Sequence, residues 1–161
     1  TLKVLLKYPQ FNKFVVVTGK SFKSTKSFEK LIKKDNRINH QSSISEKEML
    51  NKILDAALEI VPSSTILLEL FTVGVPVITG YYIENQREAS LFFGHQKTAL
   101  VLGNMNFNYQ KKLSKQLNKV FKIDFNDMIR EQKEIMKYTN TNFINIFREV
   151  NSLANVLVHE L

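Results

Sequence analysis

The chain has 161 residues, 43% of them hydrophobic, which is enough for one domain with a buried core. It contains no cysteine, so disulfides and thiolate metal sites are excluded and a cytoplasmic location is expected; its three histidines show no metal-binding spacing. No run of about 18 residues is apolar enough to predict a membrane span, although peripheral contact with a membrane remains compatible with the sequence.

The formal net charge of +8 lies entirely in the N-terminal part of the chain. Residues 1–37 hold ten lysines and arginines against Glu29 and Asp35, and the remaining residues carry 13 charges of each sign. Two interpretations stay open: a solvated basic face, and a surface that docks on an acidic partner or another domain. Because the excess is mostly lysine with little arginine, it is weak evidence for nucleic-acid binding, and no nucleic-acid partner is expected.

Short β-branched and apolar runs alternate with helical patterns along the chain. Helices are predicted at Leu2–Lys7, Thr25–Lys34, Ser45–Leu54, Ser63–Val73 and Glu84–Phe93, with two or three amphipathic helices from Phe107 to the end. Strands are predicted at Phe14–Thr18, Arg37–Ser42, Ala56–Pro62, Pro76–Tyr81 and Thr98–Leu102. Ser45 with Glu48 forms a capping-box pattern, and Gly74 stops the helix before it.

This alternation predicts an α/β fold, a Rossmann-like parallel sheet with helices on both faces, followed by a helical C-terminal tail. We expect residues 1–161 to form a single domain. The chain opens on a helical pattern rather than on a strand with a glycine-rich turn. It is therefore expected to be a fragment of a larger two-domain protein, without the first strand and the N-terminal domain.

The segment Pro62–Thr65 follows a predicted strand and opens the next predicted helix. In an open parallel sheet, ligands bind beyond the carboxyl ends of the strands, where helix N-termini meet them. Ser63, Ser64 and Thr65 offer hydroxyl and backbone N–H groups at the positive end of the helix dipole. The first turn of the predicted helix holds no acidic residue. We interpret the turn as a phosphate site, with a plain serine cap as the alternative.

Glu69 is the one charged residue between Ile60 and Ile83. On a helical wheel it shares a face with Thr65 and Thr72, one turn behind the predicted phosphate site. A carboxylate repels phosphate, but it can accept hydrogen bonds from the vicinal diol of a ribose, as an acidic residue does in dinucleotide-binding folds. Together the two features describe a nucleotide. An exposed glutamate and a structural ion pair are the alternatives for Glu69.

Asn85 and Gln86 follow the next predicted strand, again at the start of a helix. Their amides donate and accept hydrogen bonds, which suits a sugar or a diphosphate. Asn85 alone is more often an N-cap than a ligand, and Tyr81 and Tyr82 either wall a pocket or belong to the core.

Catalytic motifs are missing from the sequence. Thr18-Gly19-Lys20-Ser21 looks like the end of a Walker A loop, but Phe14 stands where that loop needs its first glycine. No HExxH or GxSxG motif and no Cys–His arrangement occurs. We therefore predict no catalytic residue, no metal site and no cofactor within this chain.

A longer pattern carries a resemblance to a known family. The pattern is Asp55-(x)7-Ser63-Ser64-Thr65-(x)3-Glu69-(x)4-Gly74-Val75-Pro76-(x)8-Asn85-Gln86. It resembles the nucleotide-sugar-binding half of GT-B proteins, in particular the UDP-sugar hydrolases of pseudaminic acid synthesis and the peptidoglycan N-acetylglucosaminyl transferases. The resemblance covers about residues 14–105. The turn lacks the glycines usual in these relatives, and Thr139-Asn140-Thr141-Asn142 replaces a glycine-containing turn of the hydrolases.

The resemblance implies a substrate-binding site for a UDP-sugar. It puts Ser64 and Thr65, next to Ser63, at the diphosphate and Glu69 on the ribose. It puts Asn85 and Gln86 on the diphosphate or sugar, and backbone groups of Ile44 on the uracil. The base would come from the N-terminal domain of the parent protein, so the fragment alone is expected to bind without turnover. Hydrolase and transferase both stay open for the parent. A non-enzymatic binding or regulatory module with a Rossmann-like shell is the alternative.

Overall fold

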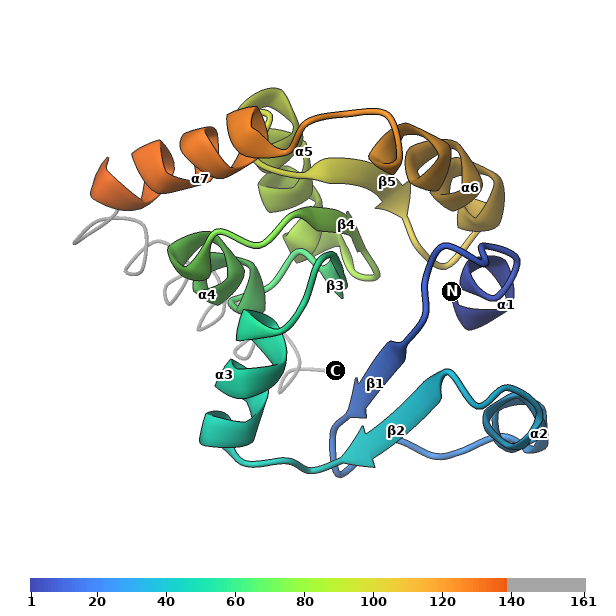
Figure 1. The fold of residues 1–161 in the computed structure, drawn as a ribbon. Helices are drawn as coiled ribbons and strands as arrows, with labels where there is room; N and C mark the ends of the chain where they lie inside the picture. Colours follow the sequence, from blue (N-terminus) through green and yellow to red (C-terminus); the bar gives the residue numbers. More distant parts are fainter. Residues whose placement is uncertain (139–161) are drawn as a thin grey trace, which may run out of the picture. The chain divides into compact units, whose positions relative to one another are not determined.

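The computed structural model describes residues 1–138 and divides the chain into two compact units, Thr1–Asp55 and Ala56–Leu161 (Figure 1). Each unit contains its own parallel sheet flanked by helices. The structure defines each unit by itself, so the expectation of a single domain over residues 1–161 stays a prediction. The Thr139–Asn142 segment of the sequence comparison lies outside the described residues.

Unit 1 is built on two parallel strands. Strand β1 (Phe14–Thr18) pairs with β2 (Ile38–Ser42), from Phe14 opposite Ile38 to Thr18 opposite Ser42. The helices of this unit are α1 (Leu2–Leu5), α2 (Lys26–Lys34) and α3 (Glu46–Leu54). The two longer helices begin at side-chain caps, and the one at Ser45 was predicted. The Thr25 hydroxyl accepts a hydrogen bond from Phe28 N at 3.2 Å, and Ser45 with Glu48 forms the complete capping box.

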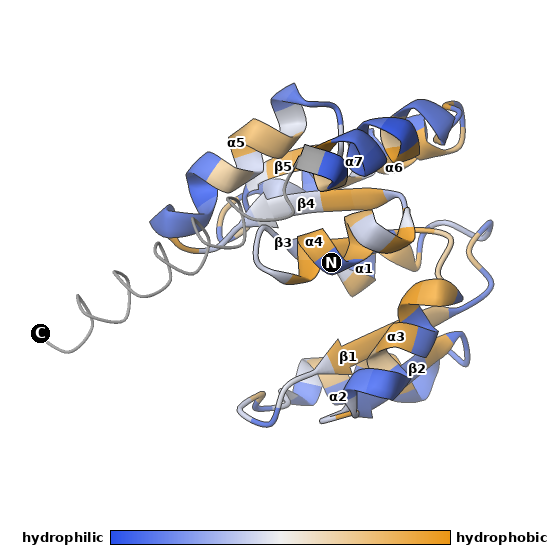
Figure 2. Ribbon diagram, turned by 90° about the vertical axis from the view of Figure 1, so that its left-hand side faces the viewer, coloured by the Kyte–Doolittle hydropathy of each residue, from blue (hydrophilic) through white to orange (hydrophobic). Residues whose placement is uncertain are grey.

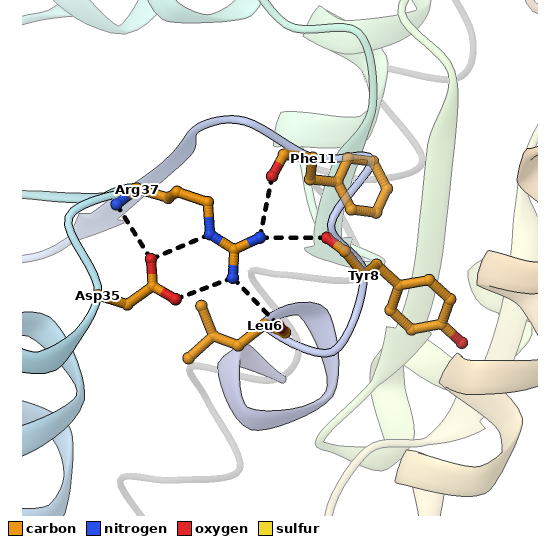
Figure 3. A network of polar contacts seen from close by, with 5 residues as sticks. All are labelled: Leu6, Tyr8, Phe11, Asp35 and Arg37. Carbon is orange, nitrogen blue, oxygen red and sulfur yellow. Dashed lines mark hydrogen bonds and ion pairs between the residues drawn. The ribbon is translucent and has the colours of Figure 1, made fainter.

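Arg37 fastens the N-terminal segment of unit 1 (Figure 3). Its guanidinium donates hydrogen bonds to the backbone carbonyls of Leu6, Tyr8 and Phe11 at 3.0–3.2 Å. It also grips both carboxylate oxygens of Asp35, at 3.0 and 2.8 Å, and these hydrogen bonds lower the pKa of Asp35. We call this group, Arg37 with Asp35 and the three carbonyls, the Arg37 clip. Only the planar fork of an arginine can serve so many acceptors at once.

Unit 2 is built on three parallel strands in the order β3 (Glu59–Pro62), β4 (Val77–Tyr81) and β5 (Leu100–Asn104). The described helical segments are α4 (Ile66–Val73), the 3-10 turn η1 (Glu84–Gln86), α5 (Arg87–His95), α6 (Tyr109–Val120) and α7 (Asn126–Tyr138). Helix α4 ends at Gly74, whose φ of +82° is the left-handed conformation that favours glycine. Within residues 1–138, no helix combines the length and apolar character needed to cross a membrane.

The core of unit 2 joins the helices to the sheet. Figure 2 shows β4 as hydrophobic over its first part and pale toward its end, and Val77 and Ile78 are fully buried. Phe71 of α4 packs edge to face on Phe93 of α5, with ring centroids 5.0 Å apart. Gln132 of α7 is also fully buried, and its side-chain amide donates hydrogen bonds to the carbonyls of Val75 and Thr98. The buried amide of Gln132 thus holds α7 against the loops that lead into β4 and β5.

The predicted α/β class with parallel sheets and flanking helices is confirmed. The strands are divided between two sheets, one in each unit, where the sequence predicts one. The largest shifts in a boundary are of three residues. Helix α4 begins at Ile66 instead of Ser63, β3 begins at Glu59 instead of Ala56, and α5 begins at Arg87, after the 3-10 turn at the predicted start Glu84. Ser63 and Ser64 continue the turn after β3, because Ser63 N pairs with the carbonyl of Gly80 and Ser64 N with that of Pro62.

Candidate functional site

The carboxyl ends of β3, β4 and β5 meet at one edge of the unit 2 sheet. Backbone hydrogen bonds connect the segments that leave this edge: Ser63 N donates to the Gly80 carbonyl at 2.7 Å, and Met105 N to the Tyr81 carbonyl at 2.8 Å. We call the three segments Ser63–Thr65, Tyr82–Gln86 and Met105–Asn108 the carboxyl edge. The fold therefore gathers six of the seven residues predicted for substrate binding at or next to one sheet edge, where ligands of parallel sheets bind.

Ser63 is fully buried and its hydroxyl is committed inside the protein. Thr79 donates its hydroxyl hydrogen to the Val61 carbonyl at 2.9 Å, so the Ser63 hydroxyl donates to Thr79 Oγ1 at 3.0 Å. Ser63 therefore fixes the turn after β3 and has no exposed surface with which to meet a ligand. Sequence reasoning had grouped it with Ser64 and Thr65 as three convergent hydroxyls.

Ser64 and Thr65 form the entry to α4. The Ser64 carbonyl accepts from Leu67 N and the Thr65 carbonyl accepts from Leu68 N, both at 3.0 Å. The backbone N–H groups of Thr65 and Ile66 precede Leu67, the first donor of these bonds. They lie at the N-terminal end of the helix, where N–H groups have no intrahelical partner. Thr65 is exposed and its side chain makes no capping hydrogen bond. The predicted alternative of a plain serine cap is therefore not what the structure shows.

Glu69 lies on the exposed face of α4. Thr65 and Thr72 are exposed with it, whereas Leu67 and Leu70 on the other side are fully buried, so the predicted polar strip is present. Over residues 1–138, Glu69 has neither an ion pair nor a hydrogen bond from its side chain. Because α4 starts at Ile66, Glu69 falls in the first helical turn, contrary to the prediction that this turn holds no acid. Its negative charge also interacts favourably with the positive N-terminal end of the helix dipole.

Asn85 and Gln86 have different surroundings in η1. Asn85 is exposed and caps no helix, since Ile83 and Gln86 hold the N-cap positions of η1 and α5. Gln86 is half-buried, and its side-chain oxygen accepts a hydrogen bond from Tyr82 N at 3.1 Å. Gln86 therefore shapes the loop after β4, and Asn85 is the amide that faces solvent.

Aromatic side chains stand beside these polar groups. Tyr82 is 44% exposed and Phe107 is 73% exposed, so neither belongs to the core. Burial of part of the Tyr82 ring and the nearby Tyr109 raise the pKa of the Tyr82 phenol. The exposure of Tyr82 argues against the core interpretation, and its place in the wall of a pocket stays a prediction.

Two residues that the sequence reading passed over also reach this region. The Asn106 side chain donates to the Tyr82 carbonyl at 2.6 Å and ties the loop after β5 to the loop after β4. The ammonium of Lys112 in α6 lies 3.3 Å from the position that a Cβ on Gly103 would take. Lys112 is exposed and forms no ion pair in the described part of the chain. Asn106 falls between the predicted strand Thr98–Leu102 and the helical region predicted from Phe107, and Lys112 lies in that helical region, so no motif in the sequence singles out either residue.

Ile44 belongs to unit 1, and because the structure defines each unit by itself, its predicted contact with the uracil stays a prediction. It is half-buried between Ser43, whose φ is +55°, and Ser45, the cap of α3. No group of three or more His, Asp or Glu side chains within residues 1–138 is arranged to hold a metal ion. No protein-family model matches the chain, and a search among curated proteins finds no significant match.

Proposed function

We propose that this chain is the donor-binding C-terminal domain of a GT-B enzyme, a UDP-sugar hydrolase or a glycosyltransferase of bacterial surface polysaccharide or pseudaminic acid synthesis. The observation that carries the proposal is the gathering of the α4 N-terminus, the exposed Glu69 strip and the η1 amides at or beside one carboxyl edge. These are the groups that a phosphate, a ribose and a sugar require.

The roles follow from the surroundings of each side chain. The amides of Thr65 and Ile66 and the Thr65 hydroxyl bind the diphosphate, while Ser63 holds the turn from beneath. Glu69 accepts hydrogen bonds from the ribose hydroxyls, and Asn85 contacts the sugar or the diphosphate, with Gln86 setting the loop. Lys112 adds positive charge near the phosphates. The protein thus supplies position and charge neutralisation.

The catalytic base, in this proposal, comes from the N-terminal domain of the parent protein, and Ile44 offers backbone groups to the uracil. The parent is a hydrolase if the full-length protein releases the free sugar from a UDP-sugar without an acceptor. It is a transferase if release requires an acceptor.

Calorimetric titration with UDP, beside CMP and GDP, tests the proposal. Saturable UDP binding is expected, and Glu69→Gln should weaken it by about 1–3 kcal/mol, the cost of a hydrogen bond to a charged group. Glu29→Gln is the matched control, because Glu29 is likewise exposed in the first turn of a helix, α2. UDP binding that both variants leave unchanged would contradict the role of Glu69. No heat from any of the nucleotides, with this chain and with the full-length parent, would overturn the proposal.

A non-enzymatic binding or regulatory module is the second candidate. The observation in its favour is that the Ser63 hydroxyl is buried and bonded while Glu69 serves the helix dipole, so both residues have a structural use. In that case Glu69→Gln leaves the biological activity of the parent protein intact.

A further inference from the structure

Unit 1 concentrates exposed lysine in two consecutive segments, the loop after β1 and the helix α2. Six lysines in the loop after β1 and on α2 are exposed, and we call them the lysine face: Lys20, Lys23, Lys26, Lys30, Lys33 and Lys34. None of the six forms an ion pair within residues 1–138, and Glu29 is the one acidic residue of α2. The α2 members border an open hollow of about 420 Å³. Figure 2 shows α2 as a predominantly hydrophilic helix.

The lysines are held outward by the packing of α2. Phe28, Leu31 and Ile32 are half-buried on the other side of the helix, which contacts β2. Long lysine side chains on the opposite face therefore project into solvent, where their like charges repel one another. An unpaired cluster of this kind is relieved by an anionic partner.

Phe22 is an exposed aromatic ring in the same loop as Lys20 and Lys23, beside α2. It is 45% exposed and sits in a tight turn in which its N–H donates to the Gly19 carbonyl at 3.1 Å. One edge packs on Phe28 of α2, with centroids 5.2 Å apart, and on His40 at 6.2 Å. The ring is thus fixed in place between Lys20 and Lys23 while nearly half of its surface meets water.

This combination fits an anionic lipid bilayer better than a nucleic acid. Clusters of four to eight lysines on an amphipathic helix attract anionic lipids without specific geometry, and an aromatic ring inserts at the headgroup level. Nucleic-acid grooves stack successive bases on several aromatics and favour arginine. Phe22 is the one exposed aromatic of residues 1–55, and the single arginine there is engaged in the Arg37 clip.

We propose that the lysine face with Phe22 is a docking surface for an anionic lipid bilayer, on which Phe22 enters the headgroup layer. The proposal concerns unit 1 alone and does not depend on nucleotide binding by unit 2. In this proposal, anionic lipid headgroups are the partner of the excess positive charge of residues 1–37.

The absence of tryptophan from the chain makes a direct test available. Phe22→Trp introduces a single reporter at an exposed position. Its emission should shift to the blue with vesicles of phosphatidylcholine and phosphatidylglycerol, stay unchanged with phosphatidylcholine alone, and return on addition of salt. Phe107→Trp, at the 73% exposed aromatic of unit 2, is the matched control and should show no shift.

Charge reversal tests the lysines separately. The double variant Lys30→Glu with Lys33→Glu should reduce vesicle partitioning, measured by co-sedimentation, by on the order of 30-fold or more. Lys111→Glu with Lys115→Glu on α6 changes the net charge equally and should leave partitioning within about twofold. Circular dichroism verifies that each variant is folded.

Three results would overturn the proposal: equal binding to neutral vesicles, equal loss in the α6 variant, or no shift of the Phe22→Trp emission on anionic vesicles. Binding of a single-stranded RNA homopolymer that depends on Lys30 and Lys33, in the absence of vesicle binding, would assign the face to nucleic acid instead.

Discussion

The two units reach stability by different means. Residues 1–55 bury five large apolar side chains, and their N-terminal segment depends on the Arg37 clip. Residues 56–138 bury fifteen apolar side chains, among them all of the largest fully buried ones. Unit 1 carries the excess charge that the sequence places before residue 38, and unit 2 is close to balanced. Hydrogen bonds to backbone carbonyls therefore contribute more to the stability of unit 1, and buried apolar area contributes more to the stability of unit 2.

The largest effect is expected from the apolar core of unit 2. Phe71→Ala removes a fully buried ring that packs on Phe93 and should lower the free energy of unfolding by about 3–5 kcal/mol. Denaturant unfolding measures the loss, and hydrogen exchange should place it in residues 56–138. Phe107→Ala, at an exposed ring, should change stability by less than about 0.5 kcal/mol. Equal losses of unfolding free energy in Phe71→Ala and Phe107→Ala would contradict the expected difference between a buried and an exposed ring.

The buried amide of Gln132 should contribute less to the free energy of unfolding than Phe71 does, but more than any exposed polar group of unit 2. Gln132→Met keeps the volume but leaves the carbonyls of Val75 and Thr98 without their donor, at a cost of roughly 1–3 kcal/mol. The side-chain oxygen has no partner of its own, which offsets part of the loss. Thermal unfolding beside Gln110→Met, an exposed position on α6, measures the difference. An unchanged melting temperature for Gln132→Met would show that this amide does not hold α7.

The Arg37 clip provides the corresponding test in unit 1. Arg37→Lys keeps the charge but removes the planar fork, so at most one or two of the five side-chain hydrogen bonds survive. Amide exchange in residues 1–14 should become at least about tenfold faster, while unit 2 keeps its protection. Arg87→Lys, at an exposed ion pair with Glu84, is the control and should change nothing measurable. Faster exchange spread over both units would contradict a local role.

Local signals explain which parts of the fold the sequence predicts. The predicted Ser45–Glu48 capping box and Gly74 stop are both present, because each depends on residues within one helical turn. The predicted start of α4 is wrong by three residues, since a long-range backbone hydrogen bond from Ser63 N to the Gly80 carbonyl holds Ser63 beside β4 and outside the helix. Helix propensity depends on neighbouring residues alone and carries no information about such a long-range hydrogen bond.

The candidate site was predictable to a similar extent. The positions of Thr65, Glu69 and Asn85 at or near one sheet edge follow from strand order and helical periodicity. The burial of Ser63 against Thr79, the hydrogen bond from Asn106 to Tyr82 and the approach of Lys112 to Gly103 join residues that are 9–24 positions apart. These contacts depend on the register between neighbouring strands and on helix packing, which no local pattern encodes.

Glu59 makes the stability of unit 2 depend on pH. Burial raises the pKa of this carboxyl to about 7 from its ordinary value of 4.5. The folded chain therefore keeps a proton that the unfolded chain loses, so stability is highest below about pH 4.5 and falls as the pH rises through 7. We expect a loss of about 1–2 kcal/mol, less than the full shift implies because the side chain is partly exposed. Glu59→Gln should flatten the profile of unfolding free energy against pH; a profile with the same slope would contradict this assignment.

The smallest effect is expected from Lys112, and it bears on the function of unit 2. Two strand spacings, about 10 Å, separate Gly103 from Ser63 across the sheet. Under the proposed function, we therefore expect the Lys112 ammonium to meet the far phosphate or the sugar rather than the phosphate at the α4 amides. Lys112→Ala should weaken UDP binding by about three- to tenfold, with a stronger effect at low salt because the ammonium acts as an exposed point charge. Lys115→Ala, one helical turn further along α6, should leave the affinity unchanged in the same titration. If both variants weaken binding equally, α6 contributes only its net charge, and the site ends at the loops after β3 and β4.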